Sequence, residues 1–141
     1  MSAGTTQQAM DGYLNALVSG GDFARFFADE VVWETPETGE RIVGRQAVRD
    51  FIIAFHRKMF DARPELKHLV VAEDAAVVEA DFVGTHTGEF AGIPPTGAKV
   101  RIPYCVTYDL VNGEIVALRG YLPVAAMVNQ LRSHSAAPDR G

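Results

Sequence analysis

One histidine lies where it could move a proton. His86 falls in the strand predicted over Val77–Thr87, on the same side as Ala80, Phe82 and Gly84. Because these neighbours are small or apolar, this face is expected to point inward, toward a pocket. An imidazole titrates near neutral pH and could act there as a general acid or base. The alternative is a structural histidine, hydrogen-bonded to the backbone where the strand meets a Gly-Ile-Pro-Pro-Thr-Gly turn.

A second set of polar side chains lies on the strand predicted over Val100–Leu110. Alternation gives this strand one mostly apolar face, which is expected to form a pocket wall with two tyrosines as polar handles. That face contains Val100, Ile102, Tyr104, Val106 and Tyr108. Asp109 falls on the opposite face and is expected to point to solvent or to a dimer partner. A single bulge would reverse the two faces and make Asp109 a candidate base.

Two large aromatic side chains, Trp33 and Phe55, are expected either to stack on a ligand or to fill the core. Cys105 is the only cysteine, so the chain has no disulfide framework and fits a reducing compartment. Its strand-like neighbours favour a buried, inert thiol over a nucleophile.

The sequence contains no motif typical of a metal site, a nucleotide-binding site or a serine hydrolase. The histidines fall in separate predicted elements without metal-ligand spacing, so no metal site is expected; they are His56, His68, His86 and His134. There is no dinucleotide-binding glycine motif, no phosphate-binding loop and no G-x-S-x-G. The sequence therefore predicts a protein that works without a cofactor.

Composition indicates one ordinary globular domain. The chain has 141 residues, 48% of them hydrophobic, and a net charge of −5 with acids and bases interspersed. This balance argues against nucleic acid or an anionic membrane surface as a partner. No apolar run reaches the roughly 20 residues of a membrane helix, and the N-terminus does not resemble a secretory signal. A cytoplasmic protein is the expectation.

Periodicity predicts helices and strands along the whole chain. Helices are expected over Thr5–Val18, Phe23–Phe27 (capped by Asp22), Arg45–Phe60 and Val124–Leu131. Strands are expected over Val31–Thr35, Leu66–Ala72, Val77–Thr87, Val100–Leu110 and Ile115–Leu122, with Pro36–Gly44 as a loop and Asn112-Gly113 as a hairpin turn. Residues 1–132 would form the domain, and residues 133–141 a disordered tail.

Helices grouped before a run of antiparallel strands indicate an α+β fold. Three segments carry a family resemblance: GTHTGEFAGIPPTG (residues 84–97), NGEIVALRGY (residues 112–121) and the final helix with Asn129-Gln130-Leu131. On these the chain resembles SnoaL-like polyketide cyclases, within the nuclear transport factor 2-like superfamily. Residues 13–39 and 44–51 also resemble ketosteroid isomerases. The resemblance implies a cone-shaped, curved antiparallel sheet wrapped around helices, an internal pocket for an apolar small molecule, and a homodimer.

The resemblance also points to particular positions. The cyclases carry an acid near the end of the last strand, where this chain has Pro123, and the isomerases carry one where this chain has Thr35. Neither residue can act as a carboxylate base. Tyr13 matches a family residue that donates a hydrogen bond to a substrate oxyanion.

Arg119 and Tyr121 share the strand parity of Pro123, so they would face inward if the family's acidic position does. There Arg119 could stabilise an enolate and Tyr121 could donate to an oxyanion. The alternatives are an arginine paired with a surface acid and a buried structural tyrosine.

Two main hypotheses follow. The first is a cofactor-independent cyclase or isomerase for a polyketide-like or other carbonyl-bearing molecule. In it Tyr13, Arg119 and Tyr121 stabilise negative charge and His86 moves the proton. The second is a non-catalytic small-ligand-binding protein, suggested by the loss of both acidic positions. A chiefly structural, partner-binding subunit is a third alternative.

Overall fold

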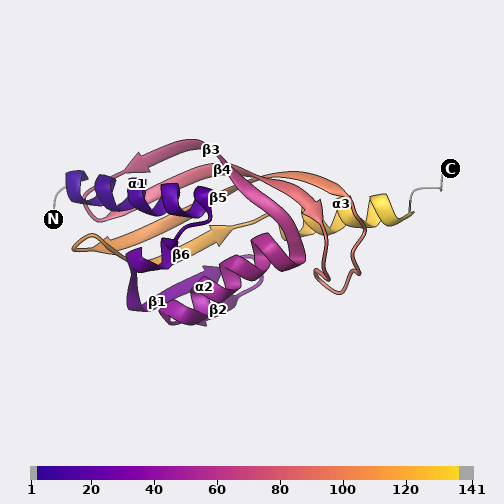
Figure 1. Ribbon diagram of the computed structural model, residues 1–141, viewed down its shortest axis with the longest axis horizontal. Coiled ribbons are helices and arrows are strands. Elements are labelled where there is room, and N and C mark those ends of the chain that lie inside the picture. The colour runs from indigo at the N-terminus through magenta and orange to yellow at the C-terminus, as the bar shows by residue number, and fades with distance from the viewer. Residues whose placement is uncertain (1–2, 137–141) are drawn as a thin grey trace.

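The computed structural model describes residues 3–136 and contains three α-helices with a single six-stranded sheet (Figure 1). The helical segments are α1 (Ala3–Ser19), the 3₁₀ turn η1 (Phe23–Phe26), α2 (Arg45–Ala54), the π-helical turn η2 (Phe55–Met59) that continues α2, and α3 (Val124–Ala136). The strands are β1 (Phe27–Thr35), β2 (Glu40–Val43), β3 (Phe60–Val71), β4 (Ala75–His86), β5 (Lys99–Val111) and β6 (Glu114–Tyr121).

The sheet has the strand order β2-β1-β6-β5-β4-β3. All neighbours are antiparallel except β1 and β6, which run parallel. The sheet is therefore mixed rather than wholly antiparallel as expected. It is curved and unclosed, and α1 and α2 lie along one of its faces, α1 against β3 and β4 and α2 against β1 (Figure 1). This is the α+β, nuclear transport factor 2-like arrangement predicted from the sequence, in a single domain.

Two apolar clusters fill the space between helices and sheet. The larger lies under α1 and α2 and includes Met10, Phe27 and Leu118. The smaller is aromatic, with edge-on ring contacts between Phe55 and Phe82 at 5.0 Å and between Phe60 and Phe82 at 5.1 Å. In it α3 contributes Met127 and Leu131, so the closing helix is held by the core.

The strongly periodic elements lie where the sequence predicts them, and the Asn112-Gly113 turn has positive φ at both residues, as a tight hairpin requires. Two strands differ. Short, exposed β2 occupies part of the predicted Pro36–Gly44 loop. Strand β3 begins at Phe60, earlier than predicted, and includes Pro64, which is tolerated because β3 is an edge strand.

Helix ends also differ from expectation. The side chain of Asp22 makes no capping hydrogen bond, and the turn that follows it is 3₁₀ rather than α-helical. Helix α3 continues through Ala136, so the first four residues of the expected tail are helical, and residues 137–141 lie outside the described part. Over residues 3–136, no helix has the length and hydropathy to cross a bilayer.

Candidate functional site

A small cavity of about 50 Å³ lies between the sheet and the α2–η2 helix. Its wall brings together five residues chosen from the sequence: Tyr13, Trp33, Phe55, Tyr104 and Tyr108. Leu17, Phe51, Ile52, His56, Phe82, Val106 and Leu122 complete the lining. This volume is well below that of a typical small-molecule site, so the cavity is suited to one part of a ligand, such as a carbonyl group.

Three tyrosines are among the polar residues that line this cavity. The hydroxyls of Tyr13 and Tyr108 are hydrogen-bonded to each other, and the ring centroids lie 5.6 Å apart. Burial raises the pKa of Tyr13, Tyr104 and Tyr108, so all three stay protonated. In a bonded pair of hydroxyls one donates to the other, and the second keeps a proton to donate elsewhere. The cavity can therefore stabilise a negatively charged oxygen.

Trp33 is held in the cavity wall from two sides. Its Nε1–H donates to the buried Thr35 hydroxyl at 2.8 Å. Its ring packs tilted against Phe51, at 5.3 Å between centroids. Thr35, which occupies the isomerase acid position in the resemblance, thus orients the indole of Trp33.

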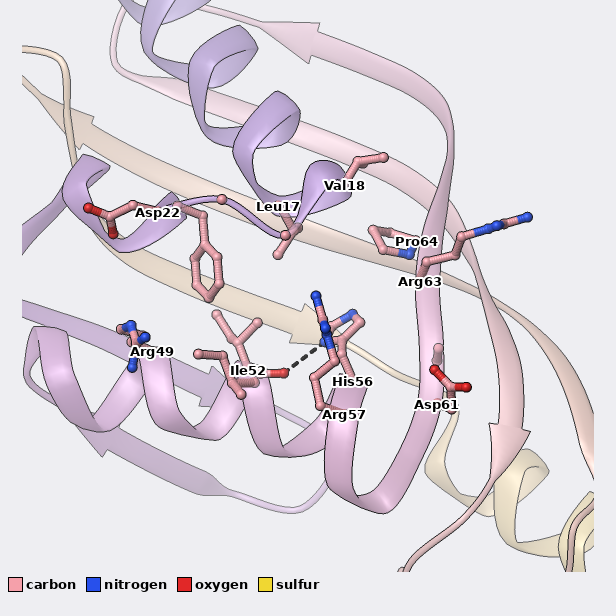
Figure 2. A pocket seen from close by; sticks show the side chains of 15 residues that line it. Leu17, Val18, Asp22, Arg49, Ile52, His56, Arg57, Asp61, Arg63 and Pro64 are labelled. Atoms are coloured by element: carbon pink, nitrogen blue, oxygen red, sulfur yellow. Dashed lines mark hydrogen bonds between the residues drawn. The ribbon is translucent and has the colours of Figure 1, made fainter.

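An open pocket of about 530 Å³ adjoins the cavity, between the end of α1, the α2–η2 helix and the start of β3 (Figure 2). The two share Leu17, Ile52 and His56 in their walls. The open pocket has the volume of a typical small-molecule site, and the small cavity lies next to it, across these shared residues. Five charged residues also line the open pocket: Asp22, Arg49, Arg57, Asp61 and Arg63.

His56 lies at the junction of the two spaces, on the π-helical turn. Its Nδ1 lies 2.8 Å from the Ile52 carbonyl oxygen, so Nδ1 must carry the proton of that hydrogen bond (Figure 2). Nε2 is then a lone-pair acceptor, and it is buried without a partner among the described residues.

Burial lowers the pKa of His56, the hydrogen bond to Ile52 partly opposes this, and the charge of Arg57 lowers it further. His56 is therefore neutral near pH 7, with the free nitrogen of a general base. Single-turn π-helices are frequent at functional sites.

His86 lies outside this cavity and the open pocket. It is fully buried, beside Phe60, with 5.3 Å between ring centroids. Its Nδ1 accepts from the Thr96 amide at 3.1 Å and lies 2.9 Å from the Thr96 hydroxyl. Burial lowers the pKa of His86, and the nearby backbone of Gly88 raises it by a smaller amount. The Nε2 atom of His86 has no hydrogen-bond partner among the described residues. In this position the ring fastens the Gly-Ile-Pro-Pro-Thr-Gly turn to β4.

Arg119 and Tyr121 do not face inward, which corrects the placement expected from strand parity. Tyr121 is half exposed, and Arg119 forms two hydrogen bonds to Asp109, at 2.9 and 3.0 Å. The expectation assumed that the position of Pro123 faces inward, but the buried residues in this part of β6 are Leu118 and Gly120, on the opposite parity. Arg119 and Tyr121 therefore lie on the outer face of the sheet, where Asp109 also lies.

At the end of β6, Leu122 lines both the cavity and a shallow groove, whereas Pro123 lines only the groove. Among the described residues in the cavity wall, none is acidic. Over residues 3–136, no group of three or more His, Cys, Asp or Glu side chains is placed to hold a metal ion.

Sequence reasoning considered His56 only as a metal ligand and overlooked it as a base. A signal was present, because His56 is four residues after Ile52 and eight after Val48. It therefore falls on the same buried face of the predicted helix. A histidine on an otherwise apolar helix face that covers a sheet is a candidate for the interior of a cavity.

Residues 7–131 match the SnoaL-like polyketide cyclase family, so the chain belongs to that family. Membership supports a cyclase- or isomerase-type function in general. No curated protein sequence matches the chain significantly.

Solved structures show the same fold. A candidate SnoaL-like polyketide cyclase from Jannaschia sp. CCS1 is 18% identical, with a TM-score of 0.81 over 95% of this chain and 94% of that one. AclR, a candidate hydroxylase from Streptomyces galilaeus, is 18% identical, with a TM-score of 0.76 over 94% and 98% of the two chains. A candidate ketosteroid isomerase from Kribbella flavida DSM 17836 is 22% identical, with a TM-score of 0.66 over 84% and 78%.

Proposed function

We propose that the protein is a cofactor-independent enzyme of the cyclase or isomerase type that forms an enolate from a carbonyl-bearing small molecule. The observation that carries the proposal is His56, a neutral imidazole whose buried Nε2 has no partner among the described residues. It lies beside a cavity with three protonated tyrosines. A base next to oxyanion donors is the minimal equipment for enolate chemistry.

The reaction would begin with the substrate body in the open pocket and its carbonyl group in the cavity. His56 Nε2 takes a proton from the carbon next to the carbonyl, and the C–H electron pair moves to form the enolate. A tyrosine hydroxyl of the Tyr13, Tyr104 and Tyr108 group donates to the enolate oxygen. In isomerisation the proton returns to another carbon; in cyclisation the enolate carbon attacks a second carbonyl, and the proton goes to the new alkoxide.

This assignment gives His56 the role that sequence reasoning gave to His86. His86 is committed to Thr96 and lines neither space. Tyr13 keeps its expected role, and Arg119 and Tyr121 have none in the chemistry. A homodimer remains part of the proposal, because the outer face of the sheet exposes apolar side chains such as Val77 and Tyr121. Light scattering of the wild-type chain tests it.

Deuterium exchange into 2-tetralone, a small ketone with acidic α-protons, tests the function. In D₂O, proton NMR should show faster loss of the α-proton signal with the wild-type protein than with buffer alone. His56→Ala should remove the acceleration, and Tyr108→Phe should reduce it. Because His68 is an exposed histidine on β3, paired with Glu79, His68→Ala serves as the control and should match the wild type.

Exchange by folded His56→Ala at the wild-type rate would overturn the role of His56. If the wild-type protein gives no exchange above buffer, the enzymatic proposal fails. The second candidate, a non-catalytic ligand-binding protein, is favoured by the small cavity with no acidic residue among its described lining. Native mass spectrometry that finds a retained ligand, returned unchanged after incubation, would support that alternative.

A further inference from the structure

The open pocket is lined by more positive than negative side chains, although the protein as a whole is acidic. Three arginines line it, Arg49, Arg57 and Arg63, against two aspartates, Asp22 and Asp61. The whole chain carries a net charge of −5, so this local balance runs against the average of the surface. A local excess of positive charge favours the binding of anions.

The pocket arginines are also available to a ligand. In the part of the chain that the structure describes, Arg57 and Arg63 form no ion pair or hydrogen bond. Among the described residues, Arg49 forms an ion pair only with its neighbour in sequence, Asp50, at 3.2 Å. Arginines elsewhere differ: Arg101 and Arg119, for example, each hold a carboxylate at 2.9 Å. Unpaired guanidinium groups in a recess of this size are groups that a planar anion can engage.

Arg57 is the best placed of the three. It follows His56 directly on the π-helical turn, and its charge is close enough to lower the pKa of that histidine. Figure 2 shows Arg57 on the pocket side of η2, whereas Arg63 extends from β3 away from the pocket centre. Arg49 lies two helical turns before Arg57 on the same helix. An anion at Arg57 would therefore sit beside the proposed base.

We propose that the open pocket binds the carboxylate of a monoanionic substrate through Arg57, with Arg49 and Arg63 contributing at the rim. The substrate would then be an apolar keto acid, held by its carboxylate so that its carbonyl group reaches past His56 into the tyrosine cavity. A monoanion fits better than a phosphate dianion, because Arg57 alone among the three arginines lies beside His56, and the two aspartates of the pocket, Asp22 and Asp61, repel a second negative charge. The keto group of this substrate class rests on the proposed function, but the carboxylate site does not.

Isothermal titration calorimetry with two matched probes tests the carboxylate site. 2-Naphthylacetate carries the charge, and 2-naphthylacetamide has nearly the same shape without it. The wild-type protein should bind the acid about tenfold more tightly than the amide, since a hydrogen-bonded charge pair contributes about 1.5 kcal/mol or more. Arg57→Gln should remove most of that preference while leaving amide binding unchanged, and Arg63→Gln should have a smaller effect. A naphthyl phosphate monoester should bind less tightly than the acid.

The control is Arg132→Gln, which removes the same charge from an exposed position on α3. It should keep the full preference for the acid. Equal binding of acid and amide by the wild-type protein, binding of neither, or tighter binding of the phosphate ester would overturn the proposal. So would an equal loss in Arg132→Gln and Arg57→Gln, because that would reflect only the net charge of the protein. Exchange into 2-tetralone needs no anion, so failure of the enzymatic function would be seen separately.

Discussion

His56 has three properties that a general base needs, and each comes from a particular neighbour. The Ile52 carbonyl fixes the proton on Nδ1, which leaves Nε2 as the acceptor. Packing edge-on to Phe82, at 5.4 Å between ring centroids, keeps the ring at the cavity wall. Burial and the charge of Arg57 both lower its pKa and keep the imidazole neutral. A bound carboxylate at Arg57 would cancel that charge and make His56 a stronger base when substrate is present.

Arg119→Ala tests whether the outer face of the sheet takes part in the chemistry. Because Arg119 is paired with Asp109 on the face opposite the cavity, exchange into 2-tetralone should proceed at the wild-type rate. The lost ion pair is partly exposed, so the free energy of unfolding should fall by only about 0.5–1 kcal/mol. Urea denaturation gives that energy, and proton NMR gives the exchange rate. A folded variant with exchange reduced tenfold or more would restore Arg119 to the site.

At the scale of elements, the sequence predicted those features that depend on neighbouring residues in the chain. The inward face of β5, with Tyr104 and Tyr108, followed from simple alternation, and the Asn112-Gly113 turn from the φ angles that those residues tolerate. The placement of Arg119 and Tyr121 on β6 was wrong, because it took the position of Pro123 to face inward, whereas the buried residues there are Leu118 and Gly120. Alternation gives the two faces of a strand but not which of them is inward. His56 was missed although its place on the buried face of the predicted helix could be seen in the sequence; the part of the cavity wall that α1 and the strands supply could not.

Gly120→Ala tests how β6 shapes the cavity. A Cβ at this position would lie 2.4 Å from the Cη2 and Cζ2 atoms of Trp33, so the indole would have to move. Overpacking of this kind should lower the free energy of unfolding by about 1–3 kcal/mol. Trp33 is the only tryptophan, so its fluorescence reports both the unfolding in urea and the altered environment of the ring.

The matched control is Gly21→Ala, whose new Cβ would meet no atom nearer than 3.5 Å. It should leave the free energy of unfolding and the Trp33 emission close to wild type. If Gly120→Ala were equally silent, Trp33 would not be packed over β6 as described.

At the scale of the whole molecule, the same burial that prepares the site makes folding sensitive to acid. Two histidines, His56 and His86, have a pKa lowered from the ordinary 6.5, in both cases chiefly by burial. In the unfolded chain both take up protons as the pH falls through about 6.5, while in the folded protein they stay neutral to lower pH. Unfolded chains then bind more protons, so acid shifts the equilibrium toward unfolding. Asp81 and Asp109 also have a lowered pKa, but they reduce the stability of the folded protein only when the pH falls below about 4, where carboxylates of the unfolded chain take up protons.

Thermal unfolding followed by circular dichroism should therefore show a melting temperature that falls between pH 7.5 and pH 5. Full stability is expected above the unfolded pKa, with progressive loss as the pH drops toward the folded pKa of the two histidines. His56→Gln and His86→Gln should each flatten this dependence, even if His86→Gln also lowers the melting temperature at pH 7.5 by loosening the turn that Thr96 anchors. His68→Gln, at an exposed histidine, should keep the wild-type slope. A wild-type melting temperature that rises on acidification over this range would mean that the two imidazoles are charged in the folded protein, and the assignment of His56 as a neutral base would fail with it.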